Sequence, residues 1–128
     1  MCIRDRYSGY SVAEGLNVNG QLTLGENIAD IGGTRESYRA YKAWEAANGP
    51  EEQLLAELTN DQLFFVAQAQ GWCSVASPEF EKMRVMSNPH SPSRFRVIGP
   101  NSNLPEFHEA FSCEVGTPMH PEETCEVW

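Results

Sequence analysis

The chain has 128 residues, of which 41% are hydrophobic, and its 18 acidic and 9 basic side chains give a formal net charge of −9. This length suits one domain at most, and the hydrophobic content argues against a disordered chain. The acidic balance argues against nucleic acid and against an anionic membrane surface as partners, because both attract basic proteins.

The opening of the chain carries no recognisable targeting signal. Residues 1–6 have positive charge but no apolar stretch behind them, which is not the pattern of a signal peptide. We regard this opening as doubtful and not necessarily native. No apolar run approaches the ~20 residues that a membrane span needs. Residues 7–22 are rich in Gly, Asn and Ser, with a turn signal at Asn19-Gly20, and are predicted to be a loop.

The first helix is predicted over residues 24–47, where apolar and aromatic residues recur at spacings of three to four. Gly32-Gly33 interrupts this pattern, and each glycine costs ~1 kcal/mol relative to alanine inside a helix. Such a pair is reasonable where another backbone must approach closely. Asn48-Gly49-Pro50 ends the helix.

The remainder is predicted to contain three more helices. A segment at 51–57 can add a turn or two, and a helix then runs from Thr59 or Asn60 to about Ser74, apolar on nearly all sides and therefore buried on more than one. Ser77-Pro78 is a good start for the next helix. That helix ends near Ser87, 88–92 is a loop, 95–98 is extended and closed by Gly99-Pro100, 104–111 is helical, and the tail to Trp128 is irregular. The predicted fold class is mainly α.

The four cysteines, Cys2, Cys73, Cys113 and Cys125, contain no CxxC pair. This argues against a zinc ribbon or a thioredoxin-type site. Their even number and wide spacing suit disulfides in an oxidising compartment. Four buried reduced thiols fit the composition almost equally well, so both interpretations stay open.

Glu26 and Asp30 lie four residues apart, so a helix presents both carboxylates on one face. Like charges at this spacing oppose the helix by roughly a few tenths of a kcal/mol. A bound cation is one compensation, because one carboxylate can ligate zinc and a second can orient a ligating histidine. The alternative is a capping box from Thr23 to Glu26 at the positive helix end. From spacing alone, the cap is favoured.

The string Gly25-Glu26-Asn27-Ile28-Ala29-Asp30, followed by Gly32-Gly33, resembles the GENIAD-x-GG motif of the neprilysin-type zinc metallopeptidase family. That motif is long and specific. The resemblance continues through 37–41, 62–65, 70–73, 90–99, 107–113 and 125–128. It implies that residues 7–128 are the helical C-terminal portion of a thermolysin-like (zincin) catalytic domain.

The resemblance implies roles for five side chains. Glu26 looks like the third zinc ligand, beside two histidines of an HExxH helix, and Asp30 looks like the carboxylate that holds the first of those histidines. His90 looks like a donor to the oxyanion of the transition state. Arg96 looks like a donor to a substrate carbonyl, and Trp72 looks like a wall of the primed-side hydrophobic pocket.

Ordinary explanations exist for several of these residues. A histidine in a proline-rich loop is commonly solvated, Arg94 and Arg96 alternate around Phe95 as on an exposed strand, and Trp72 suits a core. The functional roles are preferred because the surrounding string matches the family. Gly71 stands where animal relatives commonly have valine, so the resemblance does not carry over the size of the pocket or its side-chain preference.

The two HExxH histidines have no counterpart here, since the chain has only His90, His108 and His120. The string from His108 to Ser112 imitates the start of the motif, but Ser112 stands where a second histidine is required. We therefore expect the chain alone to bind zinc weakly or not at all and to lack peptidase activity. The implied enzyme is a zinc-dependent endopeptidase for oligopeptides, with one Zn²⁺ per complete catalytic domain and the missing N-terminal part of the same protein as partner.

The family also implies an extracytoplasmic location, as a periplasmic, secreted or membrane-anchored protein whose anchor would lie in an absent N-terminal part. Cys73, Cys113 and Cys125 resemble disulfide positions of secreted members, mostly with partners expected upstream, and Cys2 stands near the expected partner of Cys125. The alternatives are a binding module without the metal site and a structural helical domain. The joint presence of Glu26 and Asp30 with His90 and Arg96 weighs against both.

Overall fold

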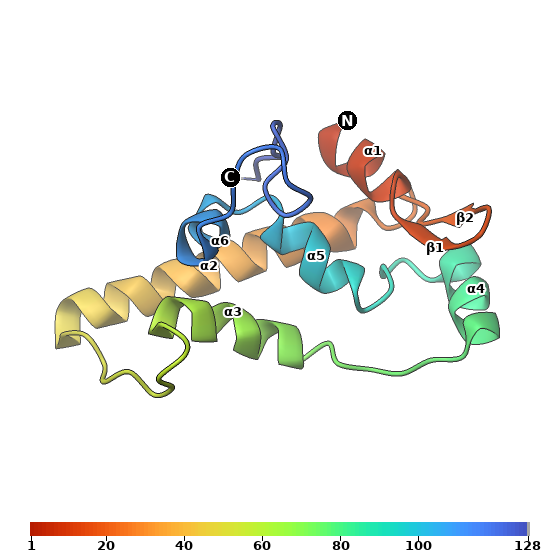
Figure 1. Ribbon diagram of the computed structural model, residues 1–128. Coiled ribbons are helices and arrows are strands. Elements are labelled where there is room, and N and C mark those ends of the chain that lie inside the picture. Colours follow the sequence, from red (N-terminus) through yellow and green to blue (C-terminus); the bar gives the residue numbers. More distant parts are fainter. Residues whose placement is uncertain (128) are drawn as a thin grey trace.

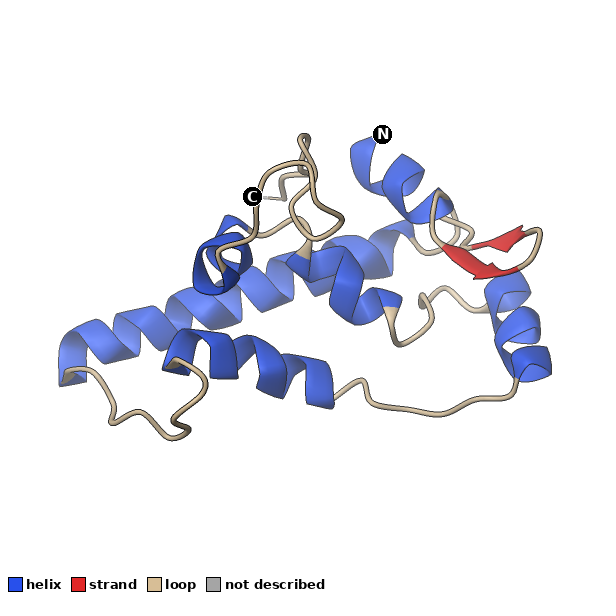
Figure 2. Cartoon of the chain, viewed as in Figure 1, coloured by secondary structure: helices blue, strands red, loops and turns tan. Residues whose placement is uncertain are grey.

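The computed structural model describes residues 1–127, and this part is mainly helical, as predicted (Figure 1). A short antiparallel hairpin, β1 (Ser11–Ala13) with β2 (Leu16–Asn17), follows the first helix (Figure 2). Within residues 1–127 there are six α-helices: α1 (Cys2–Ser8), α2 (Leu24–Asn48), α3 (Asn60–Gln70), α4 (Pro78–Ser87), α5 (Phe95–Asn101) and α6 (Pro105–Phe111). None of these helices has both the length and the apolar character of a membrane span.

The long helix α2 crosses the molecule, α3 and α5 lie beside it, and α1 contacts it near its N-terminal end at a steep angle (Figure 1). Gly32 and Gly33 do not interrupt it. Gly32 is buried, and a Cβ added at Gly33 would meet no atom within 4 Å. Gly49, at φ 87°, follows the last residue of the helix, as the Asn-Gly-Pro signal predicts.

The hydrophobic core gathers side chains from α1, α2, α3, α5 and the C-terminal tail. Its centre is aromatic: the ring of Phe65 lies 5.2 Å from the rings of both Tyr38 and Phe107. Full burial of one such side chain stabilises the fold by about 1.5–3 kcal/mol. The buried cluster consists of Ile3, Tyr7, Val18, Ile31, Tyr38, Phe65, Phe95, Leu104, Cys125 and Val127.

Tyr7 has no exposed surface and lies directly against Gly99 of α5. A Cβ at Gly99 would fall 2.0 Å from the Tyr7 hydroxyl oxygen, so the missing side chain is what lets α1 approach α5. Helix α5 itself corrects the extended prediction for 95–98. Its sequence favours a strand locally, but docking against α2 overrides that preference.

A proline inside α5 is accommodated by a side chain from α3. Pro100 has no N–H to donate to the carbonyl of Arg96, four residues earlier. Gln68 donates from Nε2 to that carbonyl instead, at 3.3 Å. The freed acceptor of α5 is therefore satisfied, and α3 is joined to α5 at the same point.

Other boundaries differ from the sequence predictions. The loop predicted over 7–22 contains the end of α1 and the hairpin, and α3 ends at Gln70 rather than near Ser74. Helix α4 has its predicted bounds, with Ser77 accepting a cap bond from the N–H of Phe80. Only Phe65 of α3 is buried, so the expected burial on several sides is not found within this chain. The division at 1–6 and 7–128 stays a prediction, and Trp128 lies outside the described residues.

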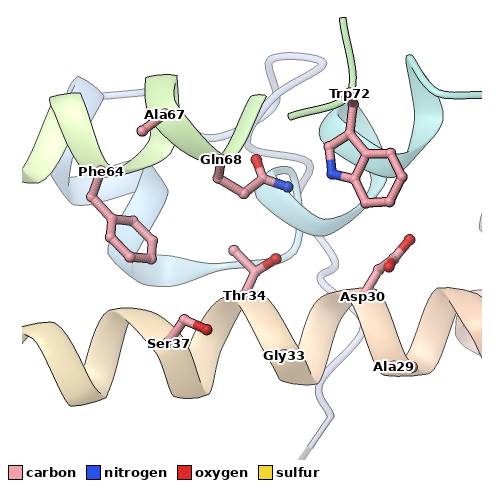
Figure 3. A pocket seen from close by; sticks show the side chains of 9 residues that line it. All are labelled: Ala29, Asp30, Gly33, Thr34, Ser37, Phe64, Ala67, Gln68 and Trp72. Carbon is pink, nitrogen blue, oxygen red and sulfur yellow. The ribbon is translucent and has the colours of Figure 1, made fainter. Parts of the chain in front are cut away.

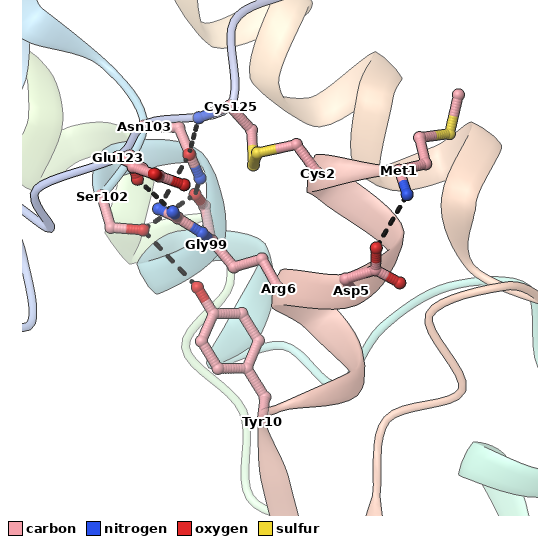
Figure 4. Close-up of a disulfide and its surroundings, with 10 residues drawn as sticks. All are labelled: Met1, Cys2, Asp5, Arg6, Tyr10, Gly99, Ser102, Asn103, Glu123 and Cys125. Carbon is pink, nitrogen blue, oxygen red and sulfur yellow. Dashed lines mark hydrogen bonds and ion pairs between the residues drawn. A yellow bond between two sulfur atoms is a disulfide. The ribbon is translucent and has the colours of Figure 1, made fainter.

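A disulfide joins Cys2 to Cys125, with their Cα atoms 5.5 Å apart, which confirms the predicted bridge (Figure 4). Its surroundings are hydrogen-bonded: the backbone N–H of Cys125 donates to Asn103 Oδ1 at 2.7 Å, and Arg6 donates to the same oxygen at 3.1 Å. Cys73 is an exposed thiol and Cys113 a half-buried one within the described part of the chain. Their predicted partners would lie outside this chain.

Replacing Cys2 and Cys125 by serine should lower the free energy of unfolding by about 2–5 kcal/mol, because the bond closes a loop that spans a sequence separation of 123. Urea denaturation without reductant measures the difference from the unchanged chain. Cys73→Ser is the matched control and should change stability by less than ~0.5 kcal/mol, as expected of an exposed site. Equal stability of the double variant and the control would contradict a stabilising bridge.

The imidazoles of His108 and His120 stack where α6 meets the C-terminal tail, with ring centroids 3.8 Å apart. His108 is only 6% exposed, and its Nε2 has no hydrogen-bond partner among the described residues. Burial, and secondarily the neighbouring His120, lower the pKa of His108 below its ordinary value of 6.5. At a pH between the lowered pKa and 6.5, His108 is therefore mostly neutral in the folded state and mostly protonated in the unfolded chain.

Because the folded-state pKa of His108 is depressed, its neutral form supports stability above pH 6.5 and this support is lost as the pH falls below 6.5. We expect the urea midpoint to fall on acidification through this range. His108→Phe keeps an aromatic ring without a titrating nitrogen, and this variant should show a smaller acid-induced shift. An identical shift in both proteins would assign the effect to other groups.

Candidate active site

Asp30 on α2 and Arg96 on α5 form a two-point ion pair. Arg96 Nε donates to Asp30 Oδ2 at 2.7 Å, and Nη2 donates to Oδ1 at 2.6 Å. The side chains are 13% and 16% exposed. The hydrogen-bonded carboxylate of Asp30 raises the pKa of Arg96, so the guanidinium stays charged. This geometry fixes both the distance and the rotation of α5 relative to α2.

Trp72, just beyond the end of α3, covers the same guanidinium. The Cζ atom of Arg96 lies 3.9 Å from the centre of the Trp72 ring, within the range of a cation–π contact. One charged group of α5 therefore meets both α2 and the segment that follows α3. Trp72 is half-buried, so one part of the ring remains open to solvent.

Glu26 lies one helical turn before Asp30 and faces His90. Glu26 Oε2 and His90 Nε2 are 2.9 Å apart, and each side chain is 41% exposed. The other side of the ring is held by Asn88, whose Oδ1 accepts from the backbone N–H of His90 at 2.9 Å and lies 3.0 Å from Nδ1. This local turn aims Nε2 at the Glu26 carboxylate.

The capping-box interpretation of Glu26 is wrong. The Thr23 side chain makes no cap bond with the first turn of α2, and its Oγ1 donates instead to the carbonyl of Asn19 at 3.0 Å. A complete capping box occurs at α3, where Thr59 and Gln62 exchange bonds. Glu26 is thereby left free of the helix end and available for other contacts.

A groove of about 420 Å³ runs between α2 and α3 beside the ion pair (Figure 3). Asp30 and Trp72 face each other across one end of it, and Phe64 lies toward the other. Its lining is mostly apolar with a few polar groups, as is usual for sites that hold a small ligand or a side chain. The groove is lined by Ala29, Asp30, Gly33, Thr34, Ser37, Phe64, Ala67, Gln68 and Trp72. Gly71, which is exposed and follows the last residue of α3, does not line it.

The structure thus brings the five predicted site residues together in two neighbouring groups. Glu26 pairs with His90, and Asp30 pairs with Arg96 under Trp72. Over residues 1–127 no cluster of three or more His, Cys, Asp or Glu side chains could hold a metal ion. An accessible carboxylate such as Glu26 suits one position of a zinc site whose other ligands come from elsewhere.

Three polar residues at this site escaped the sequence analysis. Asn27 is fully buried, and its Oδ1 accepts from Ser91 Oγ at 2.7 Å. Asn88 orients His90 as described above. The string Asn88-Pro89-His90 could have predicted the contact of Asn88 with His90, because an asparagine side chain commonly accepts a hydrogen bond from the backbone N–H two residues later. Nothing in the sequence marks Asn27 or Ser91 as a buried pair.

Arg96→Met should lower the free energy of unfolding, by at most about 3–5 kcal/mol, because it leaves the 13% exposed Asp30 carboxylate without its partner. Urea denaturation at neutral pH measures the loss. Arg94→Met is the matched control: Arg94 is two residues away at an exposed position, donates to backbone carbonyls of the hairpin and lies over the Phe95 ring, and it pairs with no carboxylate among the described residues. A cost no greater than that of the control would mean that the pair does not hold α5 to α2.

Comparisons with known proteins bear on this site. The model of peptidase family M13 matches residues 1–127. Endothelin-converting enzyme 1 of Cavia porcellus is 56% identical, with 99% of this chain and 17% of the relative covered. The human enzyme of that name is 55% identical over 99% of this chain and 16% of its own length. Neprilysin-2 of Drosophila melanogaster is 48% identical, again with 99% and 17% covered.

Two solved structures resemble this one in both sequence and shape. A Haemonchus galactose-containing glycoprotein complex matches with a TM-score of 0.90 and 35% identity, over 99% of this chain and 22% of that one. The zinc metalloprotease ZMP1 of Mycobacterium tuberculosis, in its open state, matches with a TM-score of 0.87 and 28% identity, over 99% and 21%. The chain spans only 16–17% of the curated relatives. The family match over residues 1–127 confirms the resemblance found in the sequence, and the chain belongs to peptidase family M13.

Proposed function

We propose that this chain is part of a zinc-dependent metalloendopeptidase that hydrolyses oligopeptides, to which it supplies one zinc ligand and groups that contact the substrate. The observation that carries the proposal is the pairing of Glu26 with His90 one helical turn from the pairing of Asp30 with Arg96. Membership of family M13 supports it. Because the chain spans 16–17% of its relatives, the activity is proposed for the whole protein.

Glu26 is the proposed zinc ligand of this chain, and two histidines of an HExxH helix outside this chain are the proposed partners. Bound zinc would polarise the scissile carbonyl and lower the pKa of water. Asp30 is proposed to hold the first histidine. Each of its oxygens already accepts one bond from Arg96, but a carboxylate oxygen can accept two, so capacity for an imidazole N–H remains.

His90 is proposed to donate to the negative charge that develops on the substrate carbonyl oxygen. Its Nε2 lies 2.9 Å from the proposed ligand Glu26, so it is adjacent to where that charge would form. Loss of one donor of this kind costs roughly 10²–10³-fold in kcat. Asn88 supports this role, because it fixes the ring from the opposite side.

Arg96 is proposed to bind a backbone carbonyl of the substrate. Asp30 occupies Nε and Nη2, and among the described residues no hydrogen-bond partner is found for Nη1. The ion pair holds the guanidinium plane still, so this remaining donor has a fixed direction. Trp72 is proposed to form the apolar wall against which a substrate side chain lies, beside the groove between α2 and α3.

The isolated chain is proposed to bind zinc weakly and to have no peptidase activity, since it offers one ligand of the set. An extracytoplasmic location is also proposed. The Cys2–Cys125 disulfide supports it, because such bonds persist chiefly in oxidising compartments.

The role of Glu26 can be tested in a chimaera of human endothelin-converting enzyme 1 in which this chain replaces the matching segment. Glu26→Gln should remove most of the bound zinc and lower kcat/KM beyond the ~10–100-fold cost of losing an outer-shell partner. Metal analysis and peptide hydrolysis measure the two effects. Glu36→Gln is the control, because Glu36 lies exposed on the same helix and bonds only Arg39. Equal zinc content and activity in both variants would remove Glu26 from the proposed site.

A further inference from the structure

A buried hydrogen bond joins the start of α2 to the loop that precedes α5. Ser91 Oγ donates to Asn27 Oδ1 at 2.7 Å, across 64 positions of sequence. Ser91 is 1% exposed and Asn27 has no exposed surface. A buried polar group that loses its partner finds no water to replace it, so a bond of this kind strongly restricts how helix and loop can shift.

The Asn27 amide is itself held in one orientation. Its Nδ2 donates to Thr23 Oγ1 at 2.9 Å, and Thr23 Oγ1 in turn donates its only hydrogen to the carbonyl of Asn19 at 3.0 Å. The threonine oxygen can therefore only accept from Asn27, which turns Oδ1 of the amide toward Ser91. Thr23 is 2% exposed, so the two bonds that Asn27 makes are shielded from solvent.

Asn27 and Ser91 are the sequence neighbours of the two residues of the more exposed contact, Glu26 and His90. Asn27 follows Glu26, and Ser91 follows His90. In the contact between Glu26 and His90 each side chain is 41% exposed, and a polar contact with that much solvent around it restrains the two side chains only weakly. Asn88 orients the imidazole ring but belongs to the same loop, so it does not locate the loop against α2.

We propose that Asn27 and Ser91 are positioning residues that set the distance between His90 and Glu26 from behind the site. The inference rests on the proposed function, since it assigns the two residues to the reaction in which His90 would act. It predicts that breaking the bond displaces the imidazole while leaving Glu26, on its helix, in place. The loss should therefore fall on kcat rather than on zinc binding or on substrate affinity.

The test uses the chimaera of human endothelin-converting enzyme 1 that carries this chain. Ser91→Ala should lower kcat by about 10–100-fold, the usual range when a residue that orients a metal-site side chain is lost. KM and zinc content should stay close to those of the unchanged chimaera. Ser102→Ala is the matched control: Ser102 is 2% exposed, and its Oγ donates to the Gly99 carbonyl at 3.2 Å, at the far end of α5. Both variants lose one buried hydroxyl. Ser91→Ala should lower the thermal midpoint further, because Asn27 Oδ1 loses its donor while the Gly99 carbonyl keeps its bond from Asn103. Only Ser91→Ala should lose kcat.

A second variant covers the case in which Ser91→Ala does not fold. Thr23→Val removes the acceptor that orients the Asn27 amide, and it should lower kcat in the same direction with zinc retained. The inference is overturned if Ser91→Ala, or Thr23→Val in its place, keeps the kcat of Ser102→Ala, or if its loss follows zinc content or KM. Those results leave the proposed function standing as long as Glu26→Gln abolishes zinc-dependent activity. An active chimaera that tolerates Glu26→Gln would defeat the proposed function, and this inference with it.

Discussion

The ion pair between Asp30 and Arg96 is the contact on which the docking of α5 against α2 depends. Two nearly buried charges are tolerable only when each satisfies the other, so α5 can neither slide along α2 nor rotate on it without a large energetic cost. This constraint delivers the loop before α5, and His90 within it, to the start of α2 where Glu26 lies. The same guanidinium supports Trp72, which brings the end of α3 to the groove.

Small adjustments elsewhere allow that docking. Gly99 leaves room for the fully buried ring of Tyr7, so α1 can lie close behind α5. Gln68 satisfies the carbonyl that Pro100 leaves free, which makes a proline in α5 compatible with contact to α3. The contact of Gly99 with Tyr7 lies away from the groove, whereas Gln68 lines the groove and bonds the carbonyl of Arg96. Both adjustments determine how closely α5 packs against its neighbours. The geometry of the site is therefore a property of the packed core, not of the motif on α2 alone.

Local sequence was a good guide wherever a helix is long or well capped. Periodicity predicted α2, and Ser77-Pro78 predicted the start of α4. The short helix α6 was predicted, but α1 and α5 were not. At α5 the pattern around Phe95 to Ile98 favours a strand, and tertiary contact overrides that preference. Glu26 and Asp30 were identified through a family motif, and Trp72, His90 and Arg96 through the wider resemblance to that family. The pairing of Glu26 with His90 and of Asp30 with Arg96 was not predicted, since it depends on how α5 and the loop before it dock against α2.

The burial of Asn27 was not predicted either, because its sequence context is that of any polar residue in a helix.

The bond between Cys2 and Cys125 has a topological consequence. With the first helix joined to the end of the tail, the backbone from 2 to 125 is a covalent ring. A single proteolytic cut in the exposed stretch 73–77 would not separate the molecule into two pieces while the bond is intact. For the same reason, a peptide linker could join the two ends of this chain while the backbone is opened within that stretch. In such a circular permutant α2 and α5 would keep their relative positions.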